Sequence, residues 1–89
     1  MSDSPLLMFY EDNCEPCVVV EPFVTRLENE LDVKINRLEA MNNRKNRQLL
    51  EKHAGLSMVP FFYNKKTGKK IAGETDYETL KKWALGKND

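Results

Sequence analysis

The sequence predicts an α/β fold with the element order β-α-β-α-β-β-α around a four-stranded mixed sheet. Two observations carry most of this prediction. A continuous apolar run, residues 6–10, is followed after a short gap by a long stretch with helical periodicity, and residues 59–72 have the pattern of a hairpin. With 89 residues in total, we expect one small domain over residues 1–89.

The first half predicts a βαβ unit. Residues 6–10 are typical of a strand that is buried on both faces. Residues 18–31 then predict a helix whose apolar positions share one face: Val20, Phe23, Val24, Leu27 and Leu31. Residues 33–38 predict a second strand, and a right-handed helical crossover would place it beside the first.

The second half predicts a helix, a hairpin and a final helix. Residues 44–53 form the second predicted helix, which Gly55 is placed to end. Residues 59–63 and 69–72, separated by a turn, predict an antiparallel hairpin.

The last helix is predicted to begin near Thr75. The spacing from Thr75 to Glu78 matches a capping box, in which two side chains satisfy free backbone N–H groups. Helical spacing then predicts four buried side chains: Tyr77, Leu80, Trp83 and Ala84.

Both cysteines of the chain lie in the segment Cys14-Glu15-Pro16-Cys17, between the first strand and the first helix. This is the layout of a dithiol/disulfide redox centre. The free N–H groups and positive dipole end of a helix favour a thiolate on Cys14, and Cys17 lies one turn further on, where it can resolve a mixed disulfide. Glu15 and Pro16, between them, are expected to tune the site, as is Tyr10, which is interpreted as a core aromatic residue, a partner of the dithiol, or both.

Other interpretations of the two cysteines are weaker. A structural metal site needs about four Cys or His ligands, and the chain adds only His53, which is expected to be an ordinary helix residue. A purely structural disulfide between residues three apart would constrain the unfolded chain very little. Two unrelated buried thiols remain the other alternative. We therefore expect no metal.

Charge and hydropathy favour no nucleic-acid or membrane partner. Fourteen basic and fourteen acidic residues cancel, and no apolar stretch approaches the ~20 residues that span a bilayer. Two basic groups, residues 44–47 and 65–70, are interpreted as solvated surface. Residues 1–5 are too short and polar for a signal peptide, so we expect the protein in the cytoplasm, with an organelle left open if a transit peptide has been removed. We also expect a monomer.

These features together resemble the thioredoxin superfamily over nearly the whole chain. The family's C-x-P-C motif, with a proline five residues after its second cysteine, is matched by Cys17 and Pro22, and its aromatic residue four before the first cysteine by Tyr10. Its cis-proline is matched by Val59-Pro60, and its last glycine-containing turn by Gly73. The resemblance implies a minimal thioredoxin fold, with Val59 and Pro60 contacting substrate.

The sequence departs from thioredoxins proper in ways that are closer to a glutaredoxin. Asn13 and Met8 stand where thioredoxins carry a tryptophan and a buried acid, and the chain begins directly on its first strand. Gly73 and Asp76 are similar to the segment with which glutaredoxins hold glutathione. An acid in the first turn of a helix also satisfies the helix dipole, which is the favoured interpretation of Asp76. Acidic residues around the motif, Glu11 and Asp12 among them, disfavour glutathione.

The expected function is reduction of protein disulfides. Cys14 attacks the substrate disulfide and Cys17 resolves the mixed disulfide, while the main chain of Val59 pairs with an extended substrate segment. We expect Cys14 to be exposed and Cys17 to be buried. No organic cofactor is expected; electrons would come from a reductase or from glutathione as co-substrate. The alternatives are a glutathione-dependent oxidoreductase and an interaction module with little activity.

Overall fold

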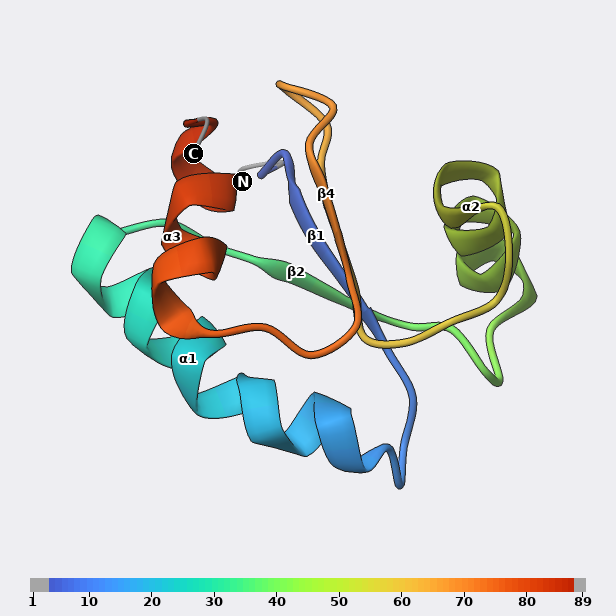
Figure 1. Ribbon diagram of the computed structural model, residues 1–89. Coiled ribbons are helices and arrows are strands. Elements are labelled where there is room, and N and C mark those ends of the chain that lie inside the picture. The colour runs from blue at the N-terminus through green and yellow to red at the C-terminus, as the bar shows by residue number, and fades with distance from the viewer. Residues whose placement is uncertain (1–3, 88–89) are drawn as a thin grey trace.

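The structure is a computed structural model that describes residues 4–87, and its elements follow the predicted order (Figure 1). The strands and helices, in chain order, are β1 (Leu6–Tyr10), α1 (Glu15–Leu31), β2 (Asn36–Glu39), α2 (Arg44–Ala54), β3 (Phe61–Asn64), β4 (Lys70–Ala72) and α3 (Tyr77–Leu85). None of the described helices is long and apolar enough to cross a membrane.

The four strands form one mixed sheet in the order β2-β1-β3-β4. β1 and β2 are parallel, joined by the crossover through α1, whereas β1 with β3 and β3 with β4 are antiparallel. The predicted α/β class, element order and four-stranded mixed sheet are therefore confirmed.

Helices cover both faces of the sheet: α1 and α3 lie on one face and α2 on the other (Figure 1). Side chains alternate along β1 accordingly. Leu6 and Met8 join the cluster formed with α1 and α3, while Leu7 and Phe9 join the cluster formed with α2. Both faces are thus covered at β1, which explains why this strand is a continuous apolar run.

The helix α1 begins at Glu15, three residues before the predicted start at residue 18, and it continues through Pro22 to Leu31. Val20, Val24 and Leu27 are fully buried, as the helical spacing predicts, whereas Phe23 and Leu31 are only partly buried. A proline within a helix removes one backbone hydrogen bond, and α1 changes direction part-way along its length (Figure 1).

The second strand begins later than predicted. Asp32 adopts a left-handed conformation at φ 53°, and the Val33 N–H donates to the Glu28 carbonyl, so these residues complete the end of α1. The Ile35 N–H then donates to the Glu28 carboxylate over 2.8 Å, and pairing starts at Asn36. Capping of the helix by this segment is the reason why residues 33–35 are not strand.

The predicted capping box of the last helix is wrong. Asp76 is the N-cap of α3: its carboxylate accepts the Thr79 N–H over 2.8 Å. Thr75 precedes the cap, and its hydroxyl donates to the Asp76 carbonyl. Threonine and aspartate are both favoured N-cap residues. Because the helix begins at Tyr77, Asp76 rather than Thr75 stands at the N-cap position. Ala84, expected to be buried, is only partly so.

Candidate functional site

Four segments that are far apart in sequence meet at one edge of the sheet. Tyr10 ends β1 opposite Glu39, the last residue of β2. Phe61 begins β3 opposite Phe9 and Ala72, so the segment before β3 and the segment after β4 leave the sheet at this same edge. The motif, the start of the β2–α2 connection, Val59-Pro60 and Gly73 are therefore brought together by strand pairing.

The two cysteines form a disulfide at the beginning of α1, with Cα atoms 5.2 Å apart. Cys14 is the N-cap residue of the helix, and its sulfur accepts the Cys17 N–H over 3.2 Å. Sulfur thus takes the place of the usual oxygen acceptor at the positive end of the helix dipole. The same amide can donate to a Cys14 thiolate once the bond is reduced.

The disulfide is largely covered: 8% of Cys14 and 6% of Cys17 is exposed. The expectation that Cys14 is exposed is therefore wrong for this disulfide-bonded form, in which both cysteines are buried. The pair borders a shallow depression of about 210 Å³, whose other lining residues include Met8, Tyr10 and Val18. Tyr10 also packs against the core cluster of α1 and α3.

The residues flanking the cysteines shape the turn into the helix. Asn13 adopts φ 62°, a left-handed conformation that asparagine tolerates better than most residues, and this lets the chain turn directly from β1 into α1. Glu15 and Pro16 occupy the first two positions of the helix and are exposed. The proline lacks an N–H that would have no helical partner there.

Three acidic residues lie close to the cysteines in the chain, and two of them, Glu11 and Asp12, line the depression at the disulfide. Glu11 is half-buried, and Asp12 and Glu15 are exposed. The first 25 residues contain no lysine or arginine, and within residues 4–87 no ion pair or side-chain hydrogen bond involves these three carboxylates. The dipole of α1 favours a thiolate on Cys14, whereas these negative charges disfavour it.

A fourth acid, Glu21, lines the same depression but is paired. Arg37 of β2 lies 2.9 Å from Glu21 and 3.0 Å from Glu28, so it ties α1 to the sheet through two carboxylates. Burial alone would raise the pKa of Glu28, but hydrogen bonds from Arg37 and from the Ile35 N–H bring that pKa below its ordinary value.

The Val59–Pro60 peptide bond is cis, and both residues precede β3, whose predicted start at residue 59 was two residues too early. Pro60 is buried, and its carbonyl accepts the Gly73 N–H over 2.8 Å. Gly73 adopts φ 93°, a conformation that suits glycine. The hydrogen bond between Gly73 and Pro60 joins the segment after β4 to the segment before β3.

Two other residues singled out by the sequence have structural roles. The Asp76 carboxylate caps α3, and the hydrogen bond from the Thr79 N–H lowers its pKa. His53 stacks on Tyr63, with ring centroids 3.9 Å apart, on the α2 side of the sheet. Whether Asp76 or Gly73 contacts a ligand stays a prediction.

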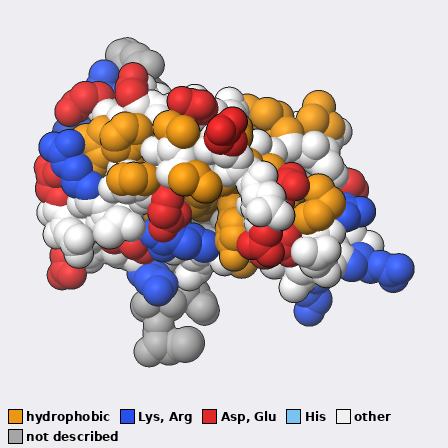
Figure 2. Space-filling model, turned by 90° about the horizontal axis from the view of Figure 1, so that it is seen from below, with side chains coloured by type: hydrophobic (Ala, Val, Ile, Leu, Met, Phe, Trp, Pro, Cys, Tyr) orange, Lys and Arg blue, Asp and Glu red, His pale blue; other side chains and the backbone are white. Residues whose placement is uncertain are grey.

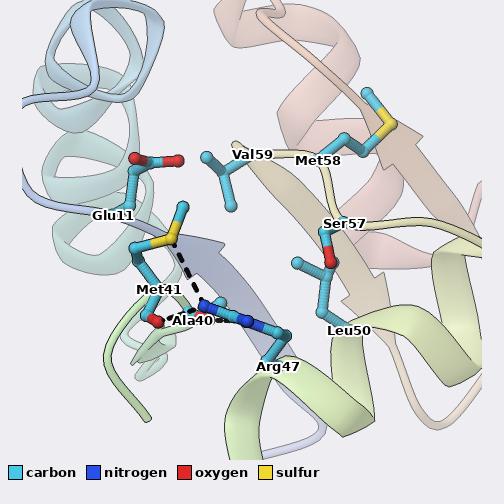
Figure 3. A pocket seen from close by; sticks show the side chains of 8 residues that line it. All are labelled: Glu11, Ala40, Met41, Arg47, Leu50, Ser57, Met58 and Val59. Atoms are coloured by element: carbon cyan, nitrogen blue, oxygen red, sulfur yellow. Dashed lines mark hydrogen bonds between the residues drawn. The ribbon is translucent and has the colours of Figure 1, made fainter. Parts of the chain in front are cut away.

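A groove beside Val59 was not predicted from the sequence (Figure 3). It measures about 220 Å³ and is lined by residues of four segments: Glu11, Ala40, Met41, Arg47, Leu50, Ser57, Met58 and Val59. Glu11 also lines the depression at the disulfide, so the two hollows share a wall. The two methionines lie in irregular connections, where periodicity gives no signal.

The described residues contain no group of three or more His, Cys, Asp or Glu side chains that could hold a metal ion. What the site does contain is a cysteine pair at a helix N-terminus, at the same end of the sheet as a cis-proline. The chemical change that this arrangement allows is reduction and re-oxidation of the Cys14–Cys17 disulfide.

Comparisons with known proteins agree with this arrangement. The Thioredoxin family model matches residues 1–85, and the chain therefore belongs to the thioredoxin family. The fold and the cysteine pair together support a thiol–disulfide oxidoreductase. No curated protein sequence matches the chain significantly.

Solved structures show the same fold. The thioredoxin-like protein BC3987 has a TM-score of 0.72 at 19% identity, covering 97% of this chain and 100% of its own. A mutant thioredoxin from Halobacterium salinarum NRC-1 has a TM-score of 0.72 at 25% identity, covering 94% and 74%. Fasciola hepatica thioredoxin has a TM-score of 0.71 at 17% identity, covering 93% and 79%.

Proposed function

We propose that this protein reduces disulfides in other proteins through Cys14 and Cys17. The observation that carries the proposal is the disulfide at the start of α1, where the Cys14 sulfur accepts the Cys17 amide. A bond between residues three apart adds little to stability, so its position in a redox-competent setting favours a catalytic role.

In the proposed reaction, the Cys14 thiolate attacks one sulfur of a substrate disulfide. The substrate disulfide breaks, a mixed disulfide forms, and the departing substrate thiolate takes up a proton. Cys17 then loses its proton and attacks the Cys14 sulfur, which releases the second substrate thiol. Two electrons pass from the protein dithiol to the substrate, and the protein ends with the Cys14–Cys17 disulfide.

The helix terminus supports Cys14 as the attacking residue. Cys14 receives the Cys17 N–H over 3.2 Å, and a hydrogen bond to the charged form of a group stabilises that form. Cys17 lies inside the first turn of α1, where its own N–H donates to the Cys14 sulfur, a position suited to attack on that neighbouring sulfur.

The segment before β3 supports a role in substrate binding. Val59 is half-buried, lines the groove and stands before the first paired residue of β3. In this proposal an extended substrate pairs with the main chain of Val59, as in strand addition, and the buried Pro60 holds that main chain in place. Gly73, bonded to the Pro60 carbonyl, would border the other side.

Electrons must be returned to the protein after each cycle. We propose a reductase as donor in a reducing compartment such as the cytoplasm, with the protein acting as a monomer. Glutathione is the weaker alternative, since Glu11, Asp12 and Glu15 would repel its carboxylates.

The test is reduction of insulin by dithiothreitol, followed as turbidity, with wild-type protein, Cys14→Ser and Cys17→Ser. We expect acceleration by the wild type only, and a mixed disulfide with substrate that accumulates in Cys17→Ser and not in Cys14→Ser. A parallel assay with a glutathione mixed disulfide separates the glutathione-dependent alternative. Equal turbidity curves for wild type and both variants would instead favour the interaction module.

A further inference from the structure

The groove beside Val59 lies next to the proposed reaction centre and has a mixed character. Its walls are mainly apolar: Leu50 is 1% exposed, and Met41 and Met58 contribute flexible thioether side chains. At one end stands the Glu11 carboxylate, which extends toward Val59 (Figure 3). Apolar walls that end at a carboxylate match a long aliphatic side chain with a positive tip.

The Glu11 carboxylate is available for such a partner. It is half-buried, and within residues 4–87 no hydrogen bond or ion pair of this side chain is present. Asp12 and Glu15 add negative charge nearby. The face on which α1 begins shows hydrophobic and acidic side chains side by side (Figure 2).

Arg47 also lines the groove, but it is engaged at the other end. Its guanidinium donates to the Met41 carbonyl, to the Ala40 carbonyl over 3.4 Å and to the Met41 sulfur over 3.4 Å. Met41 lies between Arg47 and Glu11 in Figure 3. These bonds hold the β2–α2 connection in place as a wall, so we assign Arg47 a positioning role.

We propose that the groove binds a lysine or arginine side chain of the substrate polypeptide, so that the protein prefers disulfides with a basic residue beside the reacting cysteine. The stem of that side chain lies against Met41, Leu50 and Met58, and its cation pairs with Glu11. This inference rests on the proposed function, because it names the substrate class of the same site. Glu11 is then a specificity-determining residue.

The test uses disulfide-linked homodimers of a short peptide with lysine, norleucine or glutamate next to the cysteine, before it in one series and after it in another. Pre-reduced protein is mixed with each homodimer, and release of two peptide thiols per protein disulfide formed is followed after acid quenching. We expect lysine to react faster than norleucine by about two- to fivefold, as for a weakly screened ion pair, and glutamate to react slowest. Added salt should reduce the difference.

Glu11→Gln should bring the lysine-to-norleucine rate ratio close to one. Because loss of this charge also favours the Cys14 thiolate and so changes the rate with every peptide, the rates are compared as ratios within each variant. Glu78→Gln, which removes an exposed carboxylate on α3, is the matched control and should keep the wild-type ratio. Equal rates for all three peptides with wild-type protein, or an unchanged ratio in Glu11→Gln, would overturn the inference while leaving disulfide reduction intact.

A binding measurement separates this inference from the redox proposal. Peptides with serine in place of cysteine are titrated into protein carrying labelled methionine methyl groups. We expect the Met41 and Met58 resonances to shift with the lysine peptide and much less with the glutamate peptide. If the shifts are observed but the protein reduces no disulfide, the redox proposal alone is refuted. If the shifts are absent, the groove assignment is refuted.

Discussion

Replacing Arg37 by methionine should destabilise the protein in a manner that depends on pH. Arg37 lies 3.0 Å from Glu28, whose side chain is 18% exposed, and 2.9 Å from Glu21, whose side chain is 45% exposed. Methionine retains much of the aliphatic stem of Arg37 but no charge, so the substitution isolates the two ion pairs and their hydrogen bonds.

The magnitude follows from the exposure of each pair. Two hydrogen bonds of 3.0 and 3.1 Å join Arg37 to the partly buried Glu28, and charge-assisted bonds of this kind contribute about 1.5 kcal/mol together after partial screening. The more exposed pair with Glu21 adds about 0.5 kcal/mol or less. We therefore expect a loss of about 2 kcal/mol at pH 7, which corresponds to about 10 °C in Tm for a chain of this size.

The loss should shrink in acid. The pKa of Glu28 is below its ordinary value in the folded protein, so the stability it contributes is present above its unfolded pKa and is lost as pH falls through the folded pKa. Urea unfolding followed by circular dichroism should therefore show a smaller difference between wild type and Arg37→Met at pH 2.5 than at pH 7.

Arg44→Met provides the control, since Arg44 is exposed at the start of α2, and it should change the free energy of unfolding by less than about 0.5 kcal/mol. An equal loss for Arg37→Met at pH 7 and pH 2.5 would refute the electrostatic reasoning and assign the effect to packing. No loss at pH 7 would mean that desolvation cancels the attraction.

Three further predictions concern the site and its supports. Glu15→Gln removes a negative charge next to Cys14 and should speed alkylation of the reduced protein at neutral pH, less so in high salt; an unchanged rate would show that the carboxylate points away. Asn64→Ala should cost about 2–3 kcal/mol in urea unfolding, because the buried amide that donates to the Trp83 carbonyl over 3.0 Å is lost; a loss below about 0.5 kcal/mol would contradict this role. Burial, with the charges of Lys52 and Lys70, lowers the pKa of His53 in the folded state, so wild type should lose more stability than His53→Phe between pH 7 and pH 5; parallel losses in urea titrations would argue against it.

Much of the fold follows from local patterns in the sequence. The apolar run at β1 and the stripe through Val20, Val24 and Leu27 each reflect a buried face of one element, so periodicity alone identifies them. Gly55 ends α2 with φ 85°, as a residue that tolerates the left-handed conformation should. Strand boundaries were less predictable: residues 33–35 serve the end of α1 because of a bond to Glu28, which the sequence does not reveal.

The sequence by itself indicated the class of the protein and the cysteine pair on which the proposed chemistry depends. Both cysteines stand in one motif between a strand and a helix, and the α/β pattern admits few topologies. Only the tertiary structure decided what surrounds them. Strand pairing brings Glu11, Met41 and Val59 to one edge of the sheet, and burial of the disulfide depends on the same packing. Helical and strand periods report contacts within an element, whereas a groove between irregular segments depends on distances between residues that no local pattern contains.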